Sequence, residues 1–265
     1  MEYVTSRDGT PIACESVGRG PDVVLIGTRA ENAALARELA DQFRVTSYDQ
    51  RGYGDSGDNQ PYAVDREIED LDAVLRYVGG PAGVYGASAG GALGLEAAAA
   101  GLPVGGLAVY EVPYGIKSAD DWQAYRHDLK DLLAAGRRSD AFALFMKMAG
   151  STEVQIAQSR ESAHWPACEA IAHTRLYGAE VLGNDQVPVD RLAHIGCQVL
   201  VVTGREGDEY MTGLPHGVFH AAAESIAKAV ERSRRATIDT DGHDPDSAVL
   251  AAELVPFFHE VLAQR

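Results

Sequence analysis

Short apolar runs alternate with longer amphipathic segments along most of the chain. The short runs are rich in β-branched and aromatic residues and end at Gly, Asp, Glu or Ser, which is typical of strands buried on both faces of a sheet. They occupy Val23–Ile26, Val45–Tyr48, Gly83–Tyr85, Leu107–Tyr110, Val199–Thr203 and Arg235–Ile238. Two further stretches, Tyr3–Ser6 and Pro11–Val17, flank an Asp-Gly turn and predict a hairpin at the edge of the sheet.

The amphipathic segments have the spacing of helices. They are Glu31–Gln42, Val64–Tyr77, Ala89–Ala100, Gly217–Arg232 and Ser247–Ala263. Strands and helices that alternate in this way predict right-handed crossovers and a mostly parallel central sheet flanked by helices, the α/β class.

The alternation stops between residues 112 and 190, where the periodic segments are all helical. Helices are predicted over Ala119–Ala135, Asp140–Met148, Glu153–Arg160 and Trp165–Leu182. An insertion at this point can cover the carboxyl ends of the strands, where open α/β sheets bind ligands. We therefore expect a core of residues 1–111 and 191–265 and a helical cap of residues 112–190.

The pentapeptide Gly86-Ala87-Ser88-Ala89-Gly90 has the form G-x-S-x-G. It follows a predicted strand and opens an Ala-rich helix, which is the setting of a nucleophile elbow. In such a turn the serine is held in a strained conformation, and the glycines let strand and helix approach closely. Ser88 is the candidate nucleophile, and the N–H of Ala89 at the helix N-terminus is a candidate oxyanion donor.

A serine hydroxyl is a weak nucleophile unless a base takes its proton. Among the eight histidines, His243 directly follows a predicted core strand and precedes the last helix. It should therefore lie at the same edge of the sheet as Ser88. His216 and His220 have the i, i+4 spacing of metal ligands, but without an HExxH pattern we expect a solvated helix face and no metal site.

A third group must orient the imidazole. Glu111 directly follows the strand Leu107–Tyr110 and precedes a Pro-terminated loop, where an acid is unusual unless it has a partner. Asp208 follows the strand Val199–Thr203 in a charged loop, where a solvated acid costs little. We favour Glu111 as this acid. Asp208 is the second candidate and Glu206 is the third.

The net charge and the cysteine content limit the kinds of partner and the cellular location that we expect for the protein. The 265 residues include 39 acidic and 23 basic ones, a net charge of −16. Such a surface repels nucleic acid and anionic lipid, because binding to them relies on Lys and Arg. The N-terminus has no signal-peptide pattern, no apolar stretch would span a bilayer, and the three cysteines are widely spaced. We expect a cytoplasmic monomer or homodimer with no nucleic-acid or membrane partner.

Four segments, in this order and at this spacing, resemble the α/β-hydrolase superfamily over nearly the whole chain. They are Val23–Thr28, Asp49–Ser56, Gly86–Gly90 and Asp241–His243. The resemblance implies the α/β-hydrolase fold and a Ser–acid–His triad in that chain order, with Ser88 and His243 at the matching positions and no cofactor. It also implies that the N–H of Arg29, just beyond Gly27-Thr28, completes the oxyanion hole, although Thr28 stands where the superfamily has glycine.

The position of the acid refines this resemblance. The superfamily's common Gly-x-x-Asp after the seventh strand would place the Asp at position 207, which is Gly207 here. A minority of the superfamily has its acid after strand six, as Glu111 would be. Fungal zearalenone lactonases are similar in this respect, in length, in the stretches Pro21–Leu25 and Phe43–Thr46, and in a cap tryptophan like Trp165. Haloalkane dehalogenases also resemble the chain at the acid, but they need an aspartate in place of the nucleophilic serine.

The sequence therefore predicts a serine hydrolase that cleaves a carboxylic ester or lactone bond in a small, uncharged, lipophilic substrate, with lactonase as the first hypothesis. The predicted substrate contacts are Trp165, Thr28, Val112 and Pro113. Trp122 and Tyr177 are expected either to line the substrate site or to pack in the core of the cap. One alternative is a small-molecule receptor or non-hydrolytic cyclase on the same fold. Another is a carbon–carbon bond hydrolase, which often provides basic groups for a carboxylate; only Arg29 and Arg51 are expected near the mouth.

Overall fold

The computed structural model describes residues 1–205 and 211–263. An eight-stranded sheet with the strand order β1-β2-β4-β3-β5-β6-β7-β8 lies at its centre. β2 is antiparallel to β1 and β4, and the other neighbouring strands are parallel. The predicted hairpin and mostly parallel sheet are thus confirmed. The strands are β1 (Glu2–Thr5), β2 (Pro11–Gly18), β3 (Asp22–Ile26), β4 (Arg44–Tyr48), β5 (Ala82–Ala87), β6 (Val104–Tyr110), β7 (Val199–Arg205) and β8 (Ser233–Asp241).

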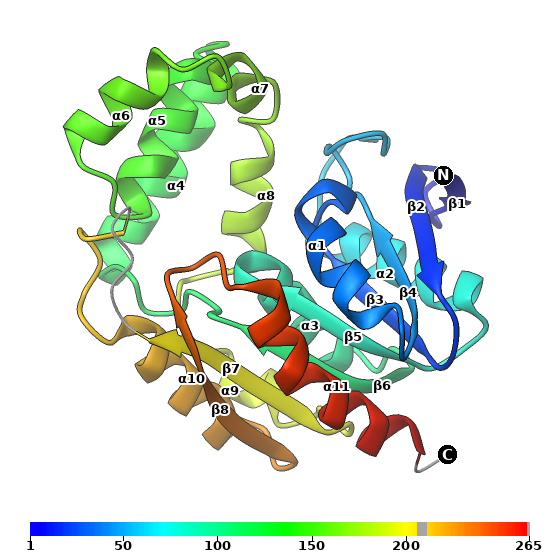
Figure 1. Cartoon of the computed structure of the whole chain (residues 1–265). Coiled ribbons are helices and arrows are strands. Elements are labelled where there is room, and N and C mark those ends of the chain that lie inside the picture. The colour runs from blue at the N-terminus through cyan, green and yellow to red at the C-terminus, as the bar shows by residue number, and fades with distance from the viewer. Residues whose placement is uncertain (206–210, 264–265) are drawn as a thin grey trace.

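Helices cover both faces of this sheet (Figure 1). α1 (Arg29–Leu39) and α11 (Ser247–Ala263) contact each other on one face. The opposite face is covered by α2 (Val64–Val78), α3 (Ser88–Ala99), α9 (Val189–Leu192) and α10 (Val218–Ala229). Within the part of the chain that the structure describes, no helix combines the length and the apolar character needed to span a membrane.

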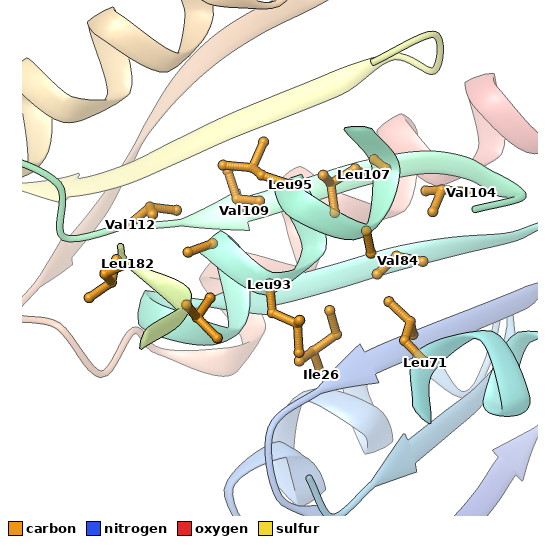
Figure 2. Close-up of a cluster of buried hydrophobic side chains, with 14 of the residues drawn as sticks. Ile26, Leu71, Val84, Leu93, Leu95, Val104, Leu107, Val109, Val112 and Leu182 are labelled. Carbon is orange, nitrogen blue, oxygen red and sulfur yellow. The ribbon is translucent and has the colours of Figure 1, made fainter. Parts of the chain in front are cut away.

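The parallel strands from β3 to β7 contribute side chains to two apolar cores. Along β3, Val24 and Ile26 pack into the core beneath α2 and α3, whereas Val23 and Leu25 pack into the core beneath α1 and α11. Because both faces are buried, the strands are continuous apolar runs in the sequence rather than alternating ones. Figure 2 shows the first of these cores, in which neighbouring strands and helices contribute Ile26, Val84, Leu107, Val109, Leu71 and Leu93.

The chain between β6 and β7 forms helices that stand apart from the sheet layers (Figure 1). We call α4–α8 the helical insertion: α4 (Ala119–Ala134), α5 (Arg138–Met148), α6 (Glu153–Arg160), α7 (Trp165–Ala170) and α8 (Thr174–Val181). The prediction of one helix over Trp165–Leu182 is wrong, because the chain turns between α7 and α8. The two helices pack in different places: α7 contacts α5, whereas α8 contacts α3, α2 and α4.

Asp185 joins the two ends of the helical insertion. Its side chain is fully buried, and its carboxylate accepts hydrogen bonds from the N–H groups of Gly115 at 3.2 Å and Lys117 at 2.9 Å. Burial raises the pKa of Asp185 to about 6, and these backbone bonds oppose the rise. The segment that enters the insertion is therefore held against the segment that leaves it.

Candidate active site

Ser88 lies at the turn from β5 into α3. Its backbone φ is +52°, a left-handed conformation that costs a non-glycine residue on the order of 1–3 kcal/mol. A Cβ at Gly86 would lie 2.4 Å from the carbonyl oxygen of Gly90, so only glycine fits where the strand meets the helix. The predicted strand–turn–helix setting is therefore present. The N–H of Ala89 belongs to the first turn of α3, whose N–H groups have no carbonyl partner within the helix.

Glu111 and His243 form a hydrogen-bonded pair beyond the ends of β6 and β8. Glu111 is 5 % exposed, and its Oε2 lies 2.9 Å from Nδ1 of His243. Its Oε1 accepts a hydrogen bond from the N–H of Gly204 at 3.0 Å. Because an ionised carboxylate can only accept, the proton of a neutral His243 ring lies on Nδ1. Nε2 is then the nitrogen with a lone pair for a further proton.

Neighbouring groups fix the position of the His243 ring. Phe219 stacks on it, with the ring centroids 5.0 Å apart and the planes inclined by 17°. The hydroxyl of Tyr110 donates a hydrogen bond to the carbonyl of Gly242 at 2.9 Å, which holds the loop that carries the histidine. These contacts restrict the imidazole to one orientation relative to Glu111.

Ser88, Ala89 and His243 line one cavity of about 310 Å³ between the sheet and the helical insertion. Its wall is largely apolar and aromatic. The insertion contributes Trp122 and Tyr125 from α4, Phe145 and Met148 from α5, and Arg175 from α8. A cavity of this size and lining is typical of a site for a small organic molecule, at the lower end of the usual volumes.

The structure brings together Ser88, His243 and Glu111, which the sequence singled out. The alternative acid Asp208, like Glu206, lies outside the described residues. Pro113 lines the cavity, and its contact with a substrate stays a prediction. His220 was one of the two histidines with the spacing of metal ligands. Its Nδ1 lies 3.2 Å from the hydroxyl of Thr203. Over residues 1–205 and 211–263 no group of three His, Cys, Asp or Glu side chains could hold a metal ion.

Trp165, which was predicted as a substrate contact, has its side chain in the core of the helical insertion instead. Its indole N–H lies 2.8 Å from both Ser139 Oγ and Glu169 Oε1, and its ring packs edge-to-face on Phe142. It is 6 % exposed and does not line the cavity that contains Ser88.

Thr28 and Val112 do not line the cavity either. Thr28 is the N-cap of α1, where its hydroxyl and the Glu31 carboxylate form a capping box. Val112 is buried in the core beside α3. Both positions follow strand ends in the sequence, and the local structure uses them for helix capping and packing.

The backbone N–H of Arg29 is not the second oxyanion donor that the resemblance implied. It donates a hydrogen bond to Oδ1 of Asp49 at 2.8 Å, and the guanidinium binds the same carboxylate and Asp55. The replacement of glycine by Thr28 accompanies this difference, because Thr28 caps α1 and the helix begins directly at Arg29. Arg51 is also removed from the mouth, since it is fully buried and paired with Asp70 and Asp8.

The sequence did not identify Tyr53, Tyr125 and Arg175 as cavity residues. Trp122, which the sequence left open, lines the cavity as well. The i, i+3 spacing of Trp122 and Tyr125 on one helix could have indicated a shared face. No comparable signal marks Arg175, because the direction in which α8 faces depends on its packing against α3.

Comparison with known proteins agrees with this architecture. The sequence pattern of the alpha/beta hydrolase family matches residues 23–254. A solved alpha/beta hydrolase from Sphaerobacter thermophilus is similar at 42 % identity and a TM-score of 0.85, covering 97 % of this chain and 100 % of that one. A search of curated proteins gave no match.

Two more distant structures share the fold. One is a thermophilic esterase from Thermogutta terrifontis, with 22 % identity, a TM-score of 0.68, and coverage of 99 % of this chain and 98 % of that one. The other is an enol-lactonase from Burkholderia xenovorans, with 20 % identity, a TM-score of 0.66, and coverage of 99 % and 100 %. Together with the match over residues 23–254 and the sheet order described above, they lead to one conclusion: this chain belongs to the alpha/beta hydrolase family.

Proposed function

We propose that this protein is a serine hydrolase that cleaves a carboxylic ester or lactone through an acyl-enzyme. The observation that carries the proposal is that His243, which is hydrogen-bonded to Glu111, lines the same cavity as Ser88, and that Ser88 enters this cavity from a strained turn. A nucleophile, a base and a group that orients the base are the three parts that such chemistry requires.

In the proposed reaction, Ser88 Oγ attacks the carbonyl carbon of the substrate and its proton passes to Nε2 of His243. The carbonyl oxygen becomes an oxyanion, which the N–H of Ala89 stabilises. One such donor typically lowers the activation free energy by about 3 kcal/mol. The C–O bond to the alcohol then breaks, and the imidazolium of His243 returns the proton to the leaving oxygen. Glu111 stabilises the imidazolium while it exists.

Water completes the cycle in the second half of the reaction. The oxygen of the water attacks the acyl carbon while His243 accepts a proton from the water. The bond between the acyl carbon and Ser88 Oγ then breaks, and His243 returns the proton to Ser88. A linear ester yields an acid and a separate alcohol, whereas a lactone yields one hydroxy acid because its two products stay joined. The protein needs no further co-reactant for either outcome.

The helical insertion is the proposed cap of this site, and residues 112–190 are its proposed extent. The insertion supplies most of the apolar wall, so it would exclude water and select the substrate. A lactone is the preferred substrate class because the strand-six position of Glu111 resembles that of zearalenone lactonases. Because an esterase and an enol-lactonase share the fold, the test includes both ester and lactone substrates.

The test compares wild type with Ser88→Ala on paired linear esters and aryl-substituted γ- and δ-lactones. We expect wild-type turnover of at least one class, and a loss in kcat of about 10³-fold or more in the variant. Circular dichroism and a thermal melt verify that Ser88→Ala is folded. Turnover that survives in the folded variant would contradict the proposed mechanism.

A further inference from the structure

Arg175 on α8 is a cation that lines the proposed catalytic cavity. Its guanidinium carbon lies over aromatic rings, 4.8 Å from the centroid of Phe145, 5.5 Å from Phe142 and 5.6 Å from Tyr53. Such ring faces attract a cation. The rings supply no hydrogen-bond acceptor for the N–H groups, which point outward in the plane of the guanidinium.

The Arg175 side chain has no anionic partner among the residues that the structure describes. Its Nε is buried without a hydrogen bond, and within residues 1–205 and 211–263 no carboxylate lies within ion-pair distance of it. Other arginines of the helical insertion are paired: Arg126 with Glu180 and Arg160 with Asp140. Arg175 as a whole is half-buried, so the unsatisfied group is its buried Nε–H, which is costly to leave without an acceptor unless a ligand supplies one.

Tyr125 on α4 supplies a second donor without a partner in the same cavity. Its side chain is 6 % exposed, and its hydroxyl is buried with no hydrogen bond. Burial raises the pKa of Tyr125 and the nearby Arg175 cation opposes the rise, so the hydroxyl keeps its proton at neutral pH. Two unsatisfied donors, one of them cationic, therefore lie in one apolar cavity beside Ser88.

We propose that Arg175 and Tyr125 bind a free carboxylate of the substrate. A carboxylate can accept from the planar guanidinium and the phenol together, and charge-assisted hydrogen bonds of this kind are the strong ones. This inference rests on the proposed function and refines it. The substrate is an ester or lactone that also carries a carboxylate, such as a half ester of a dicarboxylic acid, rather than an uncharged molecule.

The other charges near the cavity are compatible with an anionic substrate. Glu31 also lines the cavity, but its side chain is exposed and its carboxylate accepts from the N–H of Thr28. The net charge of −16 acts over the whole surface, where salt screens it beyond about 8 Å at physiological ionic strength. Arg175 acts at contact distance in an apolar site, where screening is weak.

Monomethyl and dimethyl esters of succinate, adipate and suberate provide matched substrates for the test. We expect the wild type to hydrolyse the best monoester with a kcat/KM about tenfold or more above that of its diester. Arg175→Met should lower kcat/KM for the monoester by about tenfold or more, mainly through KM, and change the diester by less than about threefold. Tyr125→Phe should produce a smaller loss in the same direction.

Arg137→Met is the matched control, because Arg137 is an exposed arginine of the same insertion, paired with Asp140. It should leave both substrate classes unchanged. Equal losses for monoester and diester in Arg175→Met would mean that the residue only supports the fold, and would overturn the proposal. So would a wild-type preference for the diester at all chain lengths.

A binding experiment separates this proposal from the proposed hydrolysis. Calorimetry with monomethyl adipate and dimethyl adipate is carried out on folded Ser88→Ala and on Ser88→Ala with Arg175→Met. Binding of the monoester that Arg175→Met abolishes supports the carboxylate site even if the wild type hydrolyses neither ester. If neither ester is hydrolysed and the monoester does not bind, the carboxylate site is rejected.

Discussion

Three non-glycine residues of the described chain, Ser88, Glu111 and Asp185, have a positive φ. Each directs a polar side chain to a place that an ordinary strand or helix end does not reach. Ser88 enters the cavity, Glu111 meets His243, and Asp185 binds the backbone of the segment that enters the insertion. Backbone strain of this kind persists only where the surrounding structure enforces it. The two proposed catalytic residues thus depend on the rigidity of β5 and β6.

Gly86→Ala tests that rigidity at the residue scale. A Cβ there would lie 2.4 Å from the Gly90 carbonyl, so the turn into α3 must shift. We expect a fall in Tm of more than about 5 °C, together with loss of ester hydrolysis. Gly196→Ala is the control, because nothing lies within 4 Å of its Cβ position. Equal Tm values for the two variants would contradict this account of the turn.

Sequence reasoning reached Ser88, His243 and Glu111 because each follows a strand, and the ends of parallel strands meet at one edge of a sheet. It failed at Arg29, whose N–H is taken by Asp49 from a different strand end. It also failed at Tyr125 and Arg175. Which side of an inserted helix faces a cavity depends on how several helices pack together, and local spacing does not contain that information.

At the scale of elements, the helical insertion has a small core of its own. Trp165 joins α7 to α5 through Ser139 and Phe142, and Arg160 lies over its ring with 5.4 Å between the guanidinium carbon and the centroid. The sequence predicted the helices of this region correctly except for the break between α7 and α8. The apolar pattern continues through that break, because both helices bury a face against different neighbours.

Trp165→Ala should therefore reduce stability rather than substrate affinity. Removal of a buried tryptophan costs about 3–5 kcal/mol in unfolding free energy, and here the loss falls on the insertion. We expect a lower midpoint in urea and an unchanged KM for small esters below that midpoint. Phe145→Ala, which removes a side chain from the cavity wall, is the comparison and should raise KM. A KM that rises in Trp165→Ala without loss of stability would restore the tryptophan as a substrate contact.

At the scale of the whole molecule, core and insertion meet at a buried acid. Glu67 on α2 is 3 % exposed and accepts hydrogen bonds from Gln50 at 2.6 Å and Tyr62 at 2.8 Å. The Tyr62 ring stacks on Tyr177 of α8, with centroids 3.9 Å apart. The helix that carries Arg175 is therefore packed on a core residue that binds Glu67.

Burial raises the pKa of Glu67 from 4.5 to about 7, although its two hydrogen bonds oppose the rise. The folded state thus binds more protons than the unfolded state between these values, and stability falls as pH rises through this window. We expect the unfolding free energy of Glu67→Gln, relative to wild type, to increase by about 1–3 kcal/mol between pH 5 and pH 8. Urea unfolding at each pH measures this difference, and parallel profiles for the two proteins would contradict the assignment.

The fold as a whole was predictable because the buried strands and amphipathic helices each retain their pattern, and right-handed crossovers leave few topologies. The lining of the cavity was not predictable, because much of it comes from the insertion and from Tyr53, in segments with no shared motif. The net charge of −16 favoured an uncharged substrate, whereas the cavity contains an arginine without a partner among the described residues. The proposed carboxylate site therefore replaces the uncharged substrate that the surface charge suggested.

The most direct test of Ser88 as a nucleophile activated by His243 and Glu111 is labelling with a fluorophosphonate, followed by intact mass. Wild type, Ser88→Ala, Glu111→Gln and Asp208→Asn are compared. We predict one adduct on the wild type, none on Ser88→Ala, labelling slowed by about 10²-fold or more in Glu111→Gln, and a near wild-type rate in Asp208→Asn. An adduct on Ser88→Ala, or slowing in Asp208→Asn with none in Glu111→Gln, would contradict the proposed triad.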